Sequence, residues 1–218
     1  MHNKIGLKGK LKRKLRIAYH SMINPTFKYE EKELKYCLQD YNRAWNNERT
    51  VEIPIIQEYL KEKKDVLEIG NVLQHYQKIS HTVLDKYEKG KEIINQDAQN
   101  YSTPKRFDII ISISTFEHIG HDEKLRPQRK KNYFKLEKVI NNLKILLKEG
   151  GGIIATIPIG YNKVLDKEID RKKYKIIACM KRKNFFNDWE ETTWKKAKNV
   201  KYAEPFDNAN AIVIIKIP

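Results

Sequence analysis

The chain has 218 residues, of which 40% are hydrophobic and 33% charged, a composition typical of one ordinary globular domain. This composition excludes a disordered chain, a collagen or a coiled coil, and the longest apolar stretches are far shorter than the ~20 residues of a membrane-spanning helix. The formal charge of +16 is of the kind seen in proteins that bind a polyanion such as nucleic acid or anionic lipid, but a lysine-rich composition alone gives the same excess, and we prefer that explanation. The two cysteines, Cys37 and Cys179, form neither a CxxC pair nor a zinc-spaced cluster. We therefore expect reduced thiols, a cytoplasmic protein and no metal site.

The N-terminal segment combines cations with regularly spaced apolar residues and contains no acid before Glu30. The run from Lys8 to Arg16 places Leu11 and Leu15 one helical turn apart, which predicts a short basic amphipathic helix. A membrane-surface arm, a nucleic-acid arm and a partly ordered solvated tail all fit this pattern, and we favour the tail.

The rest of the chain first predicts a helix over Glu48–Lys61 and then changes character at Asp65. From there, short runs rich in Ile and Val alternate with polar segments, as strands covered on both faces do. One apolar helical stripe interrupts them within Pro127–Lys148, and the glycines from Gly150 onward are expected to stop this helix. This succession predicts an α/β fold with a doubly wound, mostly parallel sheet. The expected strands are Val66–Ile69, Thr82–Leu84, Glu92–Asn95, Phe107–Ile113, Gly152–Ile159, Tyr174–Met180 and an antiparallel closing strand, Ala211–Ile217.

Polar residues follow one expected strand after another, and the carboxyl ends of parallel strands form the ligand site of an open sheet. Gly70 would let the backbone turn sharply and approach a ligand. Asp85 stands where a carboxylate can accept hydrogen bonds from a ribose diol. Asp97 could accept from an adenine amino group, and Glu68 would orient the loop or meet a charged end of the ligand.

Two nucleotide-binding motifs are missing from the sequence. The loop after Gly70 lacks the further glycines of GxGxxG, which disfavours NAD or FAD. The sequence also lacks GxxxxGK[ST], so nucleoside triphosphate chemistry has no phosphate cradle.

Five segments carry a resemblance to a known family. They are DVLEIGN (Asp65–Asn71), VLDKYE (Val83–Glu88), NQDAQNY (Asn95–Tyr101), FDIIISISTFEHIG (Phe107–Gly120) and LKEGGGIIATIPIGYN (Leu147–Asn162). In this order they resemble the successive motifs of class I S-adenosylmethionine-dependent methyltransferases, in an uncharacterised microbial branch. The segment YNRAWNNERTVEIPI (Tyr41–Ile55) is similar to one that precedes the core in members suspected of acting on saccharides.

This resemblance implies a seven-stranded sheet with helices on both faces, a closing antiparallel strand and S-adenosylmethionine as cofactor. The single glycine of the first motif departs from the GxGxG that the family commonly has. We assign residues 1–47 to a basic extension with a lid-like helical segment and residues 48–218 to the catalytic domain. The implied cofactor-binding residues are Glu68, Gly70, Asn71, Asp85, Lys86, Asp97, Ala98, Ser114 and Thr115.

Methyl transfer requires positioning of the reactants and often a base that takes the proton of the acceptor. The candidates for that base are His118 and His121 with the adjacent Glu117, and His118 could instead be a wall of the pocket. The residues expected on the substrate side are Arg49, Glu52 and Tyr161.

Three functions are compatible with these residues. We favour transfer of a methyl group to an oxygen, or less readily a nitrogen, of a small molecule or saccharide. The first alternative is an RNA methyltransferase that uses the basic surface. The second is a non-enzymatic binding protein on a decayed methyltransferase fold, motivated by the missing glycines.

Overall fold

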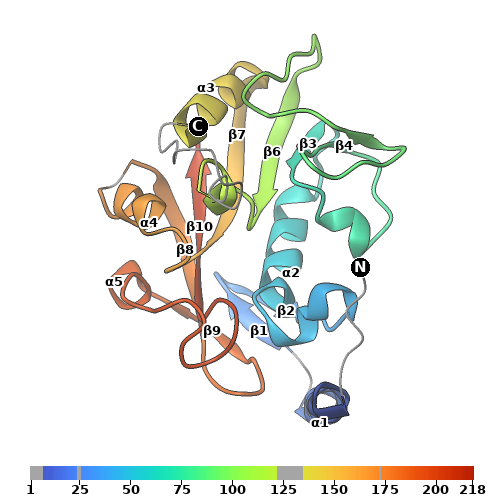
Figure 1. Ribbon diagram of the computed structural model, residues 1–218, viewed down its shortest axis with the longest axis vertical. Helices are drawn as coiled ribbons and strands as arrows, with labels where there is room; N and C mark the ends of the chain where they lie inside the picture. Colours follow the sequence, from blue (N-terminus) through green and yellow to red (C-terminus); the bar gives the residue numbers. More distant parts are fainter. Residues whose placement is uncertain (1–6, 24–25, 122–134, 172) are drawn as a thin grey trace, which may run out of the picture.

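A computed structural model describes residues 7–23, 26–121, 135–171 and 173–218 of the chain (Figure 1). Its centre is an eight-stranded sheet with the strand order β5-β4-β3-β6-β7-β10-β8-β9. The strands are β3 (Val66–Ile69), β4 (Thr82–Leu84), β5 (Ile93–Ile94), β6 (Phe107–Ile113), β7 (Leu147–Pro158), β8 (Lys175–Arg182), β9 (Trp189–Thr192) and β10 (Ala211–Ile217). The strands from β5 to β7 pair in parallel, whereas β10 is antiparallel to both β7 and β8. The doubly wound, mostly parallel sheet is thus confirmed, and β9 adds an edge strand that was not expected.

The order of the strands reverses between β3 and β6. The chain runs outward from β3 through β4 to β5, returns to the middle of the sheet at β6 and continues on the other side with β7. In open α/β sheets such a reversal leaves a crevice outside the carboxyl ends of the two central strands, where ligands bind.

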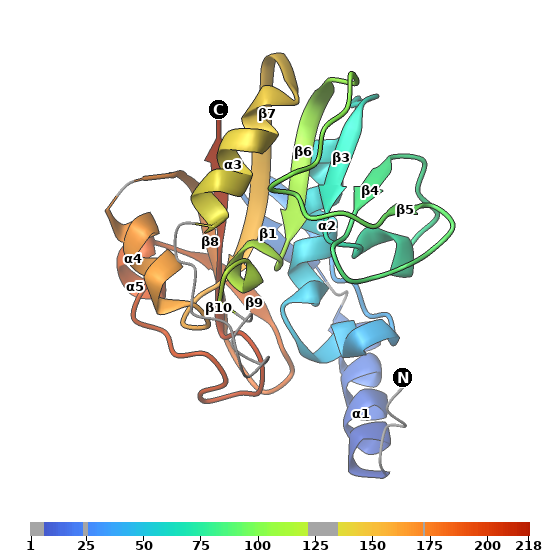
Figure 2. The same ribbon diagram turned by 45° about the horizontal axis from the view of Figure 1, so that its top comes forward.

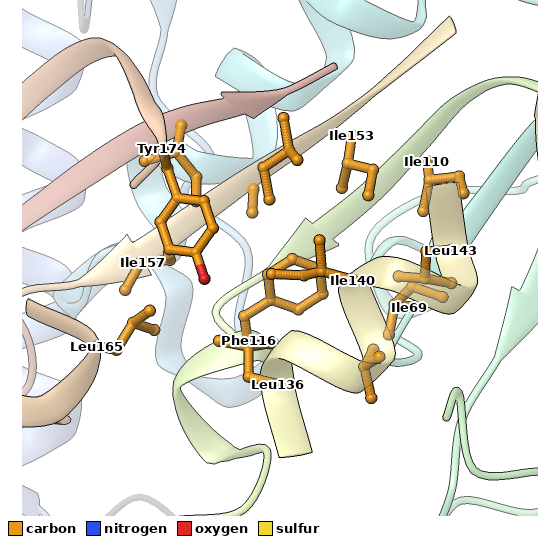
Figure 3. Packing of buried hydrophobic residues seen from close by; sticks show 14 of the residues in the cluster. Ile69, Ile110, Phe116, Leu136, Ile140, Leu143, Ile153, Ile157, Leu165 and Tyr174 are labelled. Carbon is orange, nitrogen blue, oxygen red and sulfur yellow. The ribbon is translucent and has the colours of Figure 1, made fainter. Parts of the chain in front are cut away.

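Two apolar clusters lie on opposite faces of this sheet, because neighbouring side chains of a strand alternate between its faces. In β10, Val213 and Ile215 belong to the cluster that α3 (Lys135–Ile145) covers, whereas Ile212 and Ile214 belong to the cluster that α2 (Arg49–Leu60) covers. Figure 2 shows these helices on the two sides of the sheet, and Figure 3 shows the packing against α3. Helices on both faces were expected and are present.

The connection between α3 and β7 differs from the prediction. The helix ends at Ile145 and the strand begins at Leu147, so Gly150–Gly152 lie inside β7 and do not stop the helix. Gly150 has a left-handed φ of 74°, and a Cβ at Gly151 would lie 3.1 Å from the carbonyl oxygen of Phe107 on the neighbouring strand. Glycine therefore permits an irregular start of β7 against β6. The part of the predicted segment before residue 135 lies outside the described residues.

The N-terminal segment is more structured than the sequence indicated. Helix α1 spans Leu7–Ile23, and a hairpin of β1 (Thr26–Tyr29) and β2 (Lys32–Lys35) follows it. Phe27 and Tyr29 of the hairpin are buried in the same apolar cluster as α2. The segment before residue 48 therefore contributes to the core.

Several short elements complete the fold, and the sequence did not indicate them. Their bounds are η1 (Tyr41–Asn46), η2 (Leu73–His75), η3 (Phe116–His118), α4 (Lys163–Asp170) and α5 (Trp194–Ala197). Among the residues that the structure describes, none of the helices has the length and apolar character that a membrane crossing requires.

Candidate functional site

A cleft of about 1190 Å³ lies at the carboxyl ends of β3, β6 and β7, where the strand order reverses. One part of its wall is formed by the loop after β3 and the segment after β6. The rest is formed by η1, by the start of α2, and by the loops that precede α4 and β10. Six of the residues predicted from the sequence line it, namely Arg49, Asn71, Ser114, Glu117, His118 and Tyr161.

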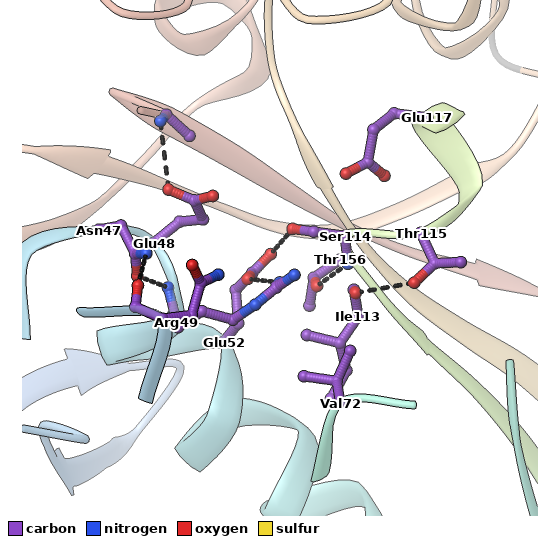
Figure 4. A network of polar contacts seen from close by, with 12 residues as sticks. Asn47, Glu48, Arg49, Glu52, Val72, Ile113, Ser114, Thr115, Glu117 and Thr156 are labelled. Carbon is purple, nitrogen blue, oxygen red and sulfur yellow. Dashed lines mark hydrogen bonds and ion pairs between the residues drawn. The ribbon is translucent and has the colours of Figure 1, made fainter. Parts of the chain in front are cut away.

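A buried polar network joins two sides of this cleft (Figure 4). Ser114 Oγ donates to Glu52 Oε1 at 2.6 Å, and Glu52 Oε2 lies 2.5 Å from Arg49 Nη1. Ser114 stands at the end of β6 with a left-handed φ of 39°, and its N–H donates to the carbonyl oxygen of Thr156 at 3.0 Å. A non-glycine residue in this conformation is strained, and the hydrogen bonds hold it in place. Glu52 is fully buried below the cleft and does not line it.

The same region holds more carboxyl groups than cations. Glu48, Glu52 and Glu117 are all buried around the guanidinium of Arg49. The other arginine of the lining, Arg43, is exposed, and Asp40 and Asp207 line the cleft as well. Burial raises the pKa of Glu117 well above its usual value, with Glu52 adding to the rise and Arg49 opposing it. Burial and then Glu52 also raise the pKa of Glu48, whose Oε2 accepts a hydrogen bond from the N–H of Ala209 at 3.2 Å.

Burial by itself would lower the pKa of Arg49, but Glu52 and Glu48 outweigh it and raise this pKa. The cleft can therefore hold an additional cation, or a proton on Glu117, at little electrostatic cost.

Aromatic rings line the cleft on the side of His118. The ring centroid of Tyr161 lies 4.8 Å from that of His118 and 5.1 Å from that of Tyr202. The ring centroid of His121 lies 5.5 Å from that of Tyr161, and His121 is not part of the lining. The side chain of His118 is 44% exposed, so this ring is accessible to a molecule that enters the cleft.

The loop after β3 is held by Glu68. Its Oε1 accepts hydrogen bonds from the N–H groups of Val72 at 3.0 Å and Leu73 at 2.8 Å, and its Oε2 lies 2.7 Å from His81 Nε2. Through these contacts Glu68 holds the backbone of the loop in place.

Gly70 turns this loop with a φ of 87°. A Cβ at this position would lie 2.9 Å from Cγ2 of Thr115, so the Thr115 side chain occupies the space that the glycine leaves. Neither residue contributes to the lining of the cleft.

The other predicted cofactor residues lie at the neighbouring strand ends, outside the cleft. The carboxylate of Asp85 accepts hydrogen bonds from the N–H groups of Asn71, Tyr87 and Glu88 at 2.7 to 3.0 Å. Asp97 pairs with Lys86 at 3.0 Å and with Lys135 at 2.9 Å, and Ala98 is buried beside it.

The pKa of Asp97 is about 2, because a hydrogen bond from Gln99 and these two ammonium groups outweigh the opposing effect of burial. The structure therefore divides the predicted cofactor residues into a cleft group and an outer group.

Sequence reasoning missed several residues of the cleft. Glu48 and Tyr202 carry no pattern that distinguishes them from a helix start and a loop residue. Asn42, Arg43 and Asn208 have left-handed φ values of 45°, 54° and 67°, and asparagine is a residue type that adopts this conformation readily. The residue type at positions 42 and 208 was therefore the feature of the sequence that could have indicated left-handed turns at the cleft. Within the described part of the chain, no group of three or more His, Cys, Asp or Glu side chains is arranged to hold a metal ion.

Neither a family model nor a curated protein matches the sequence. Solved structures similar to the chain include the N-methyltransferase NodS from Bradyrhizobium japonicum WM9 in complex with S-adenosyl-L-homocysteine, at 12% identity over 78% of this chain and 85% of that chain, with a TM-score of 0.45. They also include TehB from Haemophilus influenzae, at 11% identity over 74% of this chain and 60% of that chain, with a TM-score of 0.44. The glycopeptide N-methyltransferase MtfA complexed with sinefungin is 9% identical over 76% of this chain and 84% of that chain, with a TM-score of 0.41. At these identities the similarity concerns the fold alone.

Proposed function

We propose that the protein is an S-adenosylmethionine-dependent methyltransferase that methylates an oxygen or a nitrogen of a small molecule or saccharide. The observation that carries this proposal is the acidic cleft at the point of strand reversal, lined by residues from three of the motif-like segments of the sequence. A fold alone does not determine a reaction, so the argument depends on the side chains of this cleft.

The side chains of the cleft suit a cationic ligand with several hydrogen-bond donors. Within the described residues, no donor reaches three buried acceptor atoms of its lining: Asn46 Oδ1, Asn71 Oδ1 and Glu117 Oε2. Buried polar atoms are normally paired, so these acceptors favour a ligand that brings donors. S-adenosylmethionine has a sulfonium, an ammonium group and ribose hydroxyls, which fit these acceptors and the surplus of carboxyl groups.

We assign the residues that would hold the cofactor on this basis. Asn71, Arg49 and Ser114 would form its site in the cleft, with Asp85 and Asp97 as the proposed acceptors for ribose and adenine at the neighbouring strand ends. When bound, this cofactor supplies a methyl group on a positively charged sulfur.

The chain itself would position the acceptor and take its proton. Tyr161 and Tyr202 offer ring faces and hydroxyls against which a sugar or another polar ring can lie. Glu117 and His118 stand beside them, and either can receive the proton that the acceptor loses. The two thiols, Cys37 and Cys179, are free, which is compatible with the reducing cytoplasm that we propose as the compartment.

Calorimetric titration of the full chain tests the cofactor. We expect heat of binding with S-adenosylmethionine and S-adenosylhomocysteine and none with NAD. The variant Asp85→Asn should bind both more weakly, whereas Ser102→Ala, at an exposed position, should bind as the wild type does. If neither S-adenosylmethionine nor S-adenosylhomocysteine binds, the proposal is contradicted and a binding protein on a decayed fold is favoured.

A further inference from the structure

Helix α1 exposes a continuous apolar stripe. Leu7, Leu11, Leu15 and Met22 are 85%, 59%, 54% and 86% exposed, and Ala18 between them is exposed as well. At about 100° per residue, these five side chains fall within an arc of about 80° of the helix circumference. Four of the eight large exposed hydrophobic residues in the described part of the chain therefore lie on one line along one helix.

The opposite face of α1 attaches the helix to the rest of the protein. Arg16 is buried and its Nη2 donates to the carbonyl oxygen of Asn187 at 3.1 Å. Tyr19 stacks on Phe186 at a centroid distance of 4.5 Å, and its hydroxyl donates to Asp188 Oδ2 at 3.0 Å. These contacts fix the rotation of α1 about its axis, so the stripe faces away from the body of the protein. In Figure 2, α1 projects from the fold.

Cations flank the stripe on both sides. Lys10 and Lys14 are exposed along one edge. Along the other edge, Lys12 Nζ lies 4.4 Å from the ring centroid of Phe185, which is itself 51% exposed. No Asp or Glu occurs in α1, and the whole chain carries a formal charge of +16. The exposed side of α1 is therefore apolar in the middle and positively charged at its edges.

From this arrangement we propose that α1 lies in the surface of a membrane that contains anionic lipids and attaches the protein there. An apolar stripe bordered by lysines is the pattern of a helix that inserts its apolar side between headgroups while its ammonium groups meet lipid phosphates. RNA would use the lysines but leaves the leucines without a role. A second copy of α1 would bring its own lysines against these lysines, which disfavours self-association.

Co-sedimentation of the full chain with lipid vesicles tests this proposal. The wild type should pellet with phosphatidylcholine vesicles that contain about 30% phosphatidylglycerol, and not with phosphatidylcholine alone. Leu11→Ser/Leu15→Ser should lower the partition coefficient by at least about tenfold, because two apolar side chains are removed from the contact. Lys10→Gln/Lys14→Gln should also weaken binding and make it less sensitive to salt.

Two controls make the result specific. Ile145→Ser removes another hydrophobic side chain, 66% exposed, from a different element and should leave vesicle binding unchanged. Thermal unfolding of each variant should match that of the wild type, since the changed residues are exposed.

Three results would overturn the proposal. They are the absence of binding to anionic vesicles, undiminished vesicle binding of the leucine variant, and sedimentation of the lipid-free wild type as a dimer that the leucine variant dissociates. Binding to a mixed RNA pool that only the lysine variant reduces, without vesicle binding, would assign α1 to nucleic acid.

Discussion

Ser114 Oγ and Glu52 Oε1 are joined by a 2.6 Å hydrogen bond that links the end of β6 to the first turns of α2 across 62 positions of the sequence. Both residues are buried, and Glu52 is held from the other side by Arg49. The position of Arg49 at the cleft therefore depends on the strained turn at Ser114. The strain has a structural role, because it directs the Ser114 hydroxyl at the carboxylate.

Replacing Ser114 by alanine should test this link. The change removes a donor from the buried Glu52 carboxylate, and leaving such a group short of a partner costs about 1–3 kcal/mol of the free energy of unfolding. Urea unfolding measures this loss. Ser102→Ala removes an exposed hydroxyl and should stay within about 0.5 kcal/mol of the wild type. Equal stability of both variants would contradict the link.

Because Gly70 and Thr115 lie against each other, we expect substitutions at the two positions to have coupled effects on stability. Gly70→Ala should destabilise the protein by about 2 kcal/mol or more, because it combines a φ of 87° with a clash against the Thr115 side chain. In Gly70→Ala/Thr115→Ala the nearest atoms, Oγ1 and Cγ2 of Thr115, are removed, so only the contact with the Cβ at 3.1 Å and the backbone strain remain. A double-mutant cycle from urea unfolding should therefore give a coupling energy of about 0.5–2 kcal/mol. Additive effects would show that the two side-chain positions do not compete for space.

Glu117 and His118 can be separated as candidate bases. Glu117→Gln resembles the protonated form that burial favours, so cofactor affinity should stay within a few-fold of the wild type. If Glu117 is the base, kcat falls by about 10²–10⁴ in this variant. The wild-type rate would then rise with pH through the raised pKa of Glu117, and the variant would lack this rise.

His118→Ala provides the comparison for that experiment. If Glu117 is the base, His118→Ala should raise KM more than it lowers kcat, since the ring then only lines the cleft. The reverse pattern, with kcat retained in Glu117→Gln and lost in His118→Ala, would assign the proton to the histidine.

The raised pKa of Asp166 should make the stability of the protein depend on pH. Burial raises its pKa to about 6, although one of its oxygens accepts a hydrogen bond from Gly160. An unfolded chain loses this proton near pH 3.9, so between about pH 4 and 6 the native state binds a proton that the unfolded state does not. Rising pH therefore removes about 2 kcal/mol of stability over this range.

Asp166→Asn should abolish this contribution. The free energy of unfolding, measured in urea at about pH 4 and about pH 7, should fall less in the variant than in the wild type. The same change with pH in both proteins would indicate that Asp166 titrates normally.

Phe27 tests whether the N-terminal hairpin belongs to the core. Phe27→Ala should cost about 3–5 kcal/mol, because this side chain is 3% exposed within the cluster that α2 covers. Met22→Ala, only five positions earlier but 86% exposed, should change stability by less than about 0.5 kcal/mol. A small loss in Phe27→Ala would support an extension that can be removed at residue 47.

The sheet could be predicted from the sequence, because its Ile- and Val-rich strands are buried on both faces and have few alternative structures. The strand from Phe107 to Ile113 was placed without error. The hairpin at Thr26–Lys35 was missed, since only alternate residues of it are buried and the run is short. The glycines at 150–152 gave a helix-stop signal although their role is in the start of β7, because the two uses share one residue type.

The candidate site was only partly predictable. Residues at strand ends follow from the strand pattern, which is why Asn71, Ser114 and Glu117 were identified as candidates. Which of these side chains face a cleft and which pair with a neighbour depends on loop conformation. Asp97 beside Lys135 and Tyr202 beside Tyr161 are contacts between distant segments, and no local pattern encodes them.

One contact between α1 and the cleft has a thermodynamic consequence. Arg13 of α1 forms an ion pair with Asp40, which lines the cleft. If docking of α1 shifts this pair, the affinity of the cleft for its ligand changes, and the ligand must change the affinity of α1 for its surface by the same factor. Both partners are substantially exposed, and such a pair contributes at most about 1 kcal/mol, which limits this mutual effect to about fivefold. Through this pair, docking of α1 on a membrane can change the affinity of the cleft for its ligand only moderately and cannot turn ligand binding on or off.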